Sequence, residues 1–108
     1  MKKLVVILML LVSYSTASDG YSKGFNLYKQ AKKAQRKGQI DTANKLFGQA
    51  LVIFEKSKNS SQAILKTAEL YCNGWGTKED KPKAKQLLLK AKKLGASFIN
   101  SECLNNLK

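Results

Sequence analysis

The residue types best suited to catalysis are sparse in this sequence. It has no histidine, which excludes histidine-based acid–base catalysis, Ser-His and Cys-His nucleophile pairs and histidine-ligated metals. Of seven scattered acidic residues, only Glu79 and Asp80 are adjacent, and Asp80 suits a helix cap better than a carboxylate dyad. The glycine turn at 74–78 lacks the spacing of a phosphate loop and follows no strand. We therefore expect no catalytic residue, metal ion or cofactor, and the composition favours a binding protein over an enzyme.

The two cysteines, Cys72 and Cys103, are the remaining reactive side chains. They are 31 residues apart, which is not the ligand spacing of a zinc site. Two alternatives are open for them. In an oxidising compartment they would form a disulfide, and otherwise they would be two free thiols buried as small apolar residues.

The N-terminus has the order of a secretory signal. Met1–Lys3 is basic, Leu4–Val12 is apolar, and Ser13–Ser18 is small and polar apart from one tyrosine. The apolar run has nine residues, whereas a membrane span needs about 20. We expect a signal peptide at 1–17, cleaved after Ala17 or else after Ser18, and a periplasmic or secreted chain with no transmembrane segment. The alternative is a buried N-terminal helix or strand.

The chain is strongly basic, with a formal net charge of +13. Nineteen of its twenty basic residues are lysine and only Arg36 is arginine. A protein that reads phosphates or bases in bidentate fashion normally uses arginine, so we expect no specific nucleic-acid partner. Solvated lysine faces explain most of the charge, which nevertheless favours acidic partners. A separate hypothesis, which rests on charge alone, is a cationic protein that binds membranes or nucleic acid.

The chain after the signal has almost no strand pattern and is rich in Ala, Leu, Lys and Gln, which favour helices. We expect five helices, roughly at 22–37, 41–58, 61–72, 80–94 and 97–106. The expected N-caps are Asp41, Ser60 or Ser61, and Asp80, and Pro82 falls in a first turn. The glycines that we expect at the joints are Gly38, Gly74, Gly76 and Gly95.

Two of these helix pairs repeat. Spacings of four and three residues relate Ala43, Phe47 and Ala50, and the same spacings relate Ala84, Leu88 and Ala91, 41 residues later. In the partner helices Ala31 corresponds to Ala68, an offset of 37, and a longer second loop accounts for the difference. Small residues at such points let helices of one hairpin approach closely, as in helical solenoids.

The segment 63–95 resembles a Sel-1-like repeat, a relative of the tetratricopeptide repeat. The matching residues are Ala63, Tyr71, Gly74, Gly76, Asp80, Lys83, Ala84, Lys90, Ala91 and Gly95. Thr67, Ala68 and Lys92 depart from the pattern. The segment 21–57 resembles a plain tetratricopeptide repeat more loosely, and Ile99 and Cys103 continue the repeat phase. When the two repeats are aligned, Cys103 corresponds to Thr67. This position is about 7.5 Å from Cys72 along the helix axis. A disulfide needs Cα atoms within about 7 Å, so the pairing stays open.

The resemblance implies an all-α fold, a helical-hairpin repeat solenoid of about two hairpins plus a C-terminal capping helix. The expected divisions are a signal peptide at 1–17, a tetratricopeptide-like hairpin at 18–58, a Sel-1-like repeat at 59–95 and a capping helix at 96–108. The candidate binding residues are Trp75, a lone tryptophan in a loop, and Tyr28 and Tyr71, on the inner face. The alternative for all three is a packing role.

The expected function is an exported scaffold for protein–protein interaction in the cell envelope, with a protein or peptide partner that the charge favours if it is acidic. The resemblance also extends to cysteine-rich secreted Sel-1-like proteins with penicillin-binding or weak β-lactamase activity, which is the alternative. Those proteins carry a cysteine pair within each hairpin. Here Cys72 and Cys103 fall in different hairpins, and no serine-x-x-lysine motif is present.

Overall fold

The computed structural model describes residues 20–97 and 99–107, and the predicted signal peptide at 1–17 lies outside them. Helices make up 72% of the described residues and no strand occurs among them, which confirms the all-α prediction. The helices are α2 (Gly20–Arg36), α3 (Ile40–Glu55), α4 (Ser61–Asn73), α5 (Lys81–Lys93) and α6 (Glu102–Asn105). None of these helices is long and apolar enough to cross a membrane.

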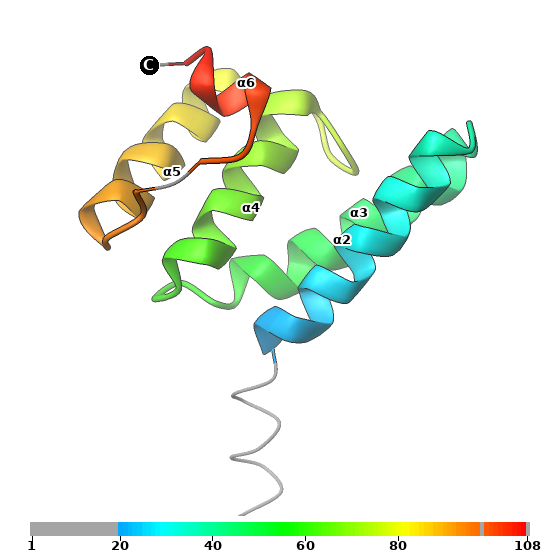
Figure 1. Cartoon of the computed structure of the whole chain (residues 1–108), viewed down its shortest axis with the longest axis horizontal. Helices are drawn as coiled ribbons and strands as arrows, with labels where there is room; N and C mark the ends of the chain where they lie inside the picture. Colours follow the sequence, from blue (N-terminus) through cyan, green and yellow to red (C-terminus); the bar gives the residue numbers. More distant parts are fainter. Residues whose placement is uncertain (1–19, 98, 108) are drawn as a thin grey trace, which may run out of the picture.

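The helices are arranged as two hairpins that meet through α3 and α4 (Figure 1). The helix α2 packs along α3, α4 packs along α5, and the short α6 contacts both α4 and α5. The helix α4 therefore lies between the first hairpin and α5, with the C-terminal segment across one side of it (Figure 1).

Local signals account for most helix ends. Ser60 caps α4, its hydroxyl accepting from the backbone N–H of Ala63 at 3.2 Å, and Asp80 caps α5 by accepting from the N–H of Lys83 at 3.0 Å. Both caps were expected. The cap expected at Asp41 is wrong, because Gln39 occupies that position and makes no side-chain cap. Asp41 lies in the first turn of α3, where its charge still favours the helix dipole.

The repeated small and large residues form the helix contacts. Ala43, Phe47 and Ala50 of α3 are at most 1% exposed, and their counterparts Ala84, Leu88 and Ala91 of α5 are at most 2% exposed. The alanines allow the paired helices to approach closely, and the larger side chains fill the space between elements. Ala31 and Ala68 are likewise fully buried.

The C-terminal helix predicted at 97–106 is wrong in its extent. The described residues between Gly95 and Ser101 are not helical, and only Glu102–Asn105 forms α6. The chain reverses at Gly95, where φ is +104°, and a new helix starts at Ser101, whose side chain accepts from the N–H of Leu104. Leu104 is 1% exposed, so burial of this side chain beside α4 holds the segment in place.

The path of the chain after Gly95 brings the two cysteines together. The sulfur atoms of Cys72, in α4, and Cys103, in α6, are bonded, and their Cα atoms are 6.1 Å apart. The separation is within the range of disulfides, so of the two alternatives the structure contains the bridge rather than free thiols. The disulfide joins the C-terminal segment to α4.

Candidate functional site

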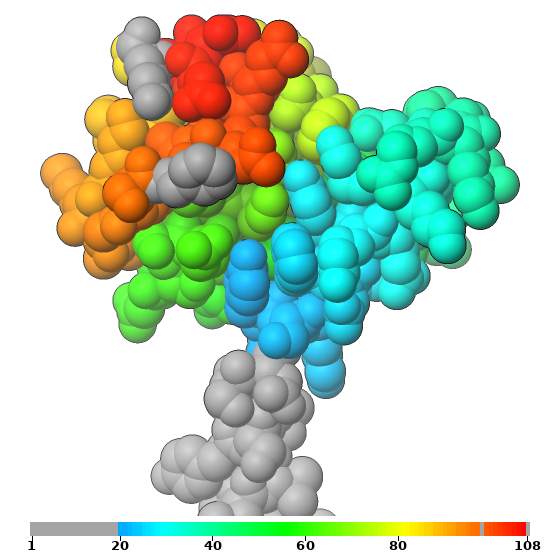
Figure 2. All heavy atoms as spheres, in the orientation of Figure 1, coloured from blue at the N-terminus to red at the C-terminus, as the bar shows by residue number. Residues whose placement is uncertain are grey.

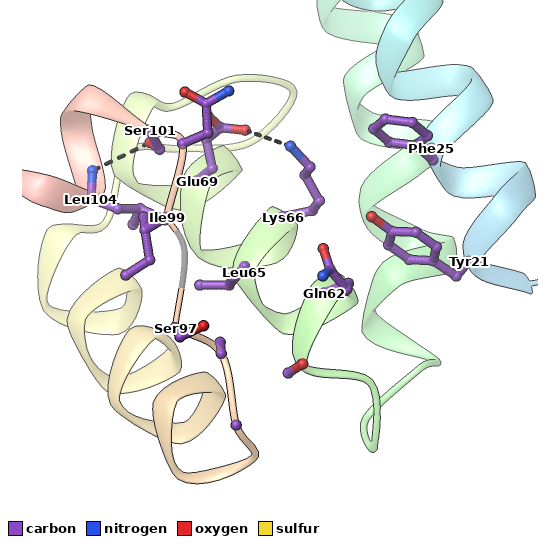
Figure 3. Close-up of a pocket in the computed structure, with 14 residues that line it drawn as sticks. Tyr21, Phe25, Gln62, Leu65, Lys66, Glu69, Ser97, Ile99, Ser101 and Leu104 are labelled. Atoms are coloured by element: carbon purple, nitrogen blue, oxygen red, sulfur yellow. Dashed lines mark hydrogen bonds and ion pairs between the residues drawn. The ribbon is translucent and has the colours of Figure 1, made fainter.

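The described surface has a cleft over α4, which we call the α4 cleft. Its volume is about 350 Å³. Tyr21 and Phe25 of α2 form one wall, and Leu65 and Lys66 of α4 form the floor. The other wall is formed by the C-terminal segment, through residues 95–97 and 99–101 and Leu104 (Figure 3). Figure 2 shows this segment in orange and red, across from the blue and cyan side chains of α2.

The α2 wall is aromatic. The rings of Tyr21 and Phe25 are stacked with centroids 5.9 Å apart, and Phe25 stacks in turn on Tyr28 at 6.0 Å. Their spacing of four and three residues places them on one side of α2. Tyr28 is 8% exposed and belongs to the core, whereas Tyr21 and Phe25 are partly buried and line the cleft.

The floor contains a buried carboxylate with two partners. Glu69 is 6% exposed, accepts a hydrogen bond of 2.5 Å from the Tyr28 hydroxyl, and lies 3.8 Å from the Lys66 ammonium. The Lys66 ammonium also lies 4.3 Å above the Tyr28 ring. A buried carboxylate needs such partners because desolvation of an unpaired charge is costly. Lys66 is turned toward Glu69 within the cleft (Figure 3).

Burial and the Glu69 carboxylate act together on Tyr28. Loss of solvent raises the pKa of the Tyr28 phenol far above its ordinary value, and the hydrogen bond to Glu69 and the charge of Glu69 raise it further. Burial alone raises the pKa of Tyr21. Both phenols are therefore neutral hydrogen-bond donors at physiological pH, and neither is suited to act as a base.

We expect Tyr28→Phe to lower the free energy of unfolding by about 1–3 kcal/mol, because Glu69 would lose its hydrogen-bond donor inside the protein. The pKa of Tyr28 is higher in the folded protein than in the unfolded chain, where it is near 10. The contribution of Tyr28 to the free energy of unfolding is therefore complete below about pH 10 and is lost as the pH rises above that value. The difference between wild type and variant should therefore shrink at alkaline pH. Urea unfolding at a series of pH values measures both effects.

Tyr71→Phe is the matched control for this prediction, since both hydrogen bonds of the Tyr71 hydroxyl, to Glu55 at 3.3 Å and from Lys83 at 3.2 Å, are exposed. We expect Tyr71→Phe to change stability by less than about 0.5 kcal/mol. Equal losses in the two variants, or a Tyr28→Phe effect that is independent of pH, would contradict a role for the buried pair.

Two of the sequence-predicted binding residues meet on Phe47. Trp75 stacks on the Phe47 ring at 5.1 Å, and Tyr28 approaches the same ring edge-on at 5.8 Å. Trp75 is partly buried, and the Lys32 ammonium lies 4.3 Å above its ring. Trp75 thus packs over α3 and has one face covered by a lysine.

Tyr71 lies apart from the other two. Its hydroxyl donates to Glu55 at 3.3 Å and accepts from the Lys83 ammonium at 3.2 Å, and Lys83 also lies 4.3 Å from the ring. The hydrogen bond to Tyr71 raises the pKa of Lys83. This group joins the second hairpin to the end of α3.

The described residues that line the α4 cleft do not include the predicted binding residues Trp75, Tyr28 and Tyr71. The sequence contained a signal for the aromatic wall, because Tyr21, Phe25 and Tyr28 have helical spacing. The sequence contained no signal for the opposite wall of the cleft, because the continuous helix predicted at 97–106 would not have formed that wall.

In residues 20–97 and 99–107, no three acidic or cysteine side chains lie close enough together to hold a metal ion. Comparisons with models of protein families, with curated proteins and with solved structures found no match to this chain.

Proposed function

We propose that this protein is an exported helical-repeat scaffold of the Sel-1-like and tetratricopeptide-like kind, which binds an extended segment of a partner protein in the α4 cleft. The observation that carries the proposal is the position of the cleft. It lies over α4, the first helix of the second hairpin, with α2, the first helix of the first hairpin, as one wall and the C-terminal segment as the other. Repeated hairpins offer extended ligands a concave surface of this kind.

The repeat reading is supported by equivalent burial in the two hairpins. The spacing shared by Ala43, Phe47 and Ala50 with their counterparts in α5 was visible in the sequence, and both sets are buried. The residue between the alanines is large in each hairpin, so the two second helices use the same packing scheme. The disulfide is consistent with export, since such bonds persist mainly in oxidising compartments.

The chemistry of the cleft favours an extended segment that carries an acidic group. Tyr21, Phe25 and Leu65 offer apolar contact area. The Lys66 ammonium is 3.8 Å from Glu69 but has three N–H donors, so it can also bind a carboxylate of a partner. The helix α2 contains no acidic residue, so the wall adds no competing negative charge. A volume of about 350 Å³ is at the small end for binding sites, which implies a short segment of modest affinity.

Selection of peptides from a random display library on the immobilised, oxidised protein tests the proposal. We expect binders that combine an acidic residue with apolar residues. Lys66→Gln should weaken them about tenfold or more by removal of one charge-assisted contact. Gln62→Trp should also weaken them, because Gln62 is an exposed residue that lines the cleft and a larger side chain would fill it.

Lys33→Gln is the control for charge, since Lys33 is exposed on α2 and does not line the α4 cleft. It should leave peptide binding within about twofold of wild type, because an exposed charge outside a contact has little effect. If Lys33→Gln weakened the selected peptides as much as Lys66→Gln, net charge rather than the cleft would explain binding.

A further inference from the structure

The helix α5 has the highest density of charge of a single sign among the described helices. The stretch 81–101 contains six lysines and no acidic residue. All six lysines lie in α5, a helix of 13 residues. Such a density of like charge opposes helix formation through repulsion unless the tertiary contacts of the helix compensate for it.

The two sides of α5 differ in kind. Ala84, Leu88 and Ala91 face the core and are at most 2% exposed. A second stripe, beside the buried one and turned away from it, consists of Lys85, Leu89, Lys92 and Lys93, which are all exposed. We call it the α5 outer face. Leu89 is 51% exposed, and Leu94, the residue that ends the helix, is 48% exposed. Two large apolar side chains therefore lie in water among lysines.

The charge of this face is not neutralised within the protein. The described residues contain two ion pairs, Lys66 with Glu69 and Lys81 with Glu79, and neither involves the lysines of the α5 outer face. The face is also at the edge of the molecule, since α5 forms the side opposite α2 and α3 (Figure 1).

We propose that the α5 outer face docks on the surface of an anionic lipid membrane. Lysines beside a membrane are attracted to anionic headgroups, and exposed leucines among them gain by entering the boundary between headgroups and acyl chains. A nucleic acid or other polyanion would satisfy the charges but not the leucines. A reader of phosphates would also normally use arginine, and this face has none.

The surface is separate from the proposed peptide site. Of the described residues that line the α4 cleft, none belongs to α5. Membrane docking therefore goes beyond the proposed function and either can fail without the other. If both hold, the protein would present the α4 cleft to partners while it lies on a membrane.

Co-sedimentation of the oxidised protein with lipid vesicles tests this proposal. We expect it to bind vesicles of equal parts phosphatidylglycerol and phosphatidylcholine, and to bind much more weakly to phosphatidylcholine alone. Each lysine beside an anionic surface strengthens binding roughly fivefold, so Lys85→Gln, Lys92→Gln and Lys93→Gln together should weaken it roughly a hundredfold. Leu89→Gln with Leu94→Gln should weaken it on the order of tenfold.

The matched control removes the same charge elsewhere. Lys33→Gln, Arg36→Gln and Lys37→Gln change three exposed basic residues of the first hairpin and should weaken vesicle binding far less. Circular dichroism and an intact disulfide establish that each variant is folded.

Three results would overturn the proposal. Equal losses in the two triple variants would show a response to net charge alone. Equal binding to neutral vesicles would exclude an electrostatic surface. An unchanged affinity of the leucine variant, together with equally tight binding to double-stranded DNA, would show that the face binds polyanions in general.

Discussion

Reduction of the Cys72–Cys103 disulfide is expected to lower the free energy of unfolding by about 3.5 kcal/mol, since the bridge closes a loop of 31 residues and restricts the unfolded chain. In a domain of this size the melting temperature should fall by roughly 15–25 °C. A single small core provides limited stability, so this loss is a large part of the total. Urea unfolding of the oxidised and reduced protein, followed by circular dichroism, measures it.

The structure adds a local consequence. Among the described residues after Gly95 the four-residue α6 is the one helix, and Leu104 and the disulfide join this segment to α4. Because this segment forms one wall of the α4 cleft, reduction should also weaken the peptides selected on the oxidised protein.

Replacement of both cysteines by alanine is the control for the reductant. The double variant should unfold at the urea concentration of the reduced protein, and addition of reductant should leave it unchanged. Coincident unfolding curves for oxidised and reduced wild type would show that the contacts of Leu104 and Ile99 hold the segment without the bridge.

Gly76→Ala is expected to lower the free energy of unfolding by about 3–4 kcal/mol. The residue has a φ of +71°, which costs a residue with a side chain about 1–2 kcal/mol. A Cβ atom there would also meet the backbone of α3, 2.4 Å from the Gly48 nitrogen and 2.7 Å from the Phe47 carbonyl carbon. The loop would have to move away from α3, and overpacking of this kind costs about 1–3 kcal/mol more.

Gly38→Ala separates the two causes. Gly38 has a similar φ of +78°, but no atom lies within 4 Å of a Cβ placed there. It should therefore cost only the backbone part, about 1–2 kcal/mol. Urea unfolding of both variants gives the comparison, and equal losses would mean that the 74–78 loop does not press on α3. Loosening of Trp75 from Phe47 should accompany Gly76→Ala alone and alter the tryptophan fluorescence.

Much of the secondary structure could be predicted because its causes are local. Ser60 and Asp80 cap helices through bonds to amides three residues away. Gly38 and Gly74 take positive φ angles that other residues rarely adopt. The repeated spacing in α3 and α5 identified their buried faces, because side chains three and four residues apart lie on one side of a helix.

Two predictions made from local signals were wrong. Asp41 has the right residue type for a cap, but the cap position is Gln39, two residues earlier, and α3 begins at Ile40. The residues after Gly95 have acceptable helix propensity, yet the structure extends the chain there and restarts a helix at Ser101. Burial of Leu104 against α4, together with the disulfide, outweighs the propensity of that stretch.

The composition and pattern of this sequence establish a basic, helical chain with paired helices and without histidine chemistry, since these properties depend on residue type and short spacing. The α4 cleft, the joining of Cys72 to Cys103 and the burial of Glu69 depend on contacts between distant parts of the chain. Glu69 shows the difference most clearly, because its partner Tyr28 is 41 residues away. A glutamate on a helix is expected to be solvent-exposed, and only the tertiary structure brings the Tyr28 hydroxyl of α2 to α4 as the donor that makes the burial of Glu69 stable.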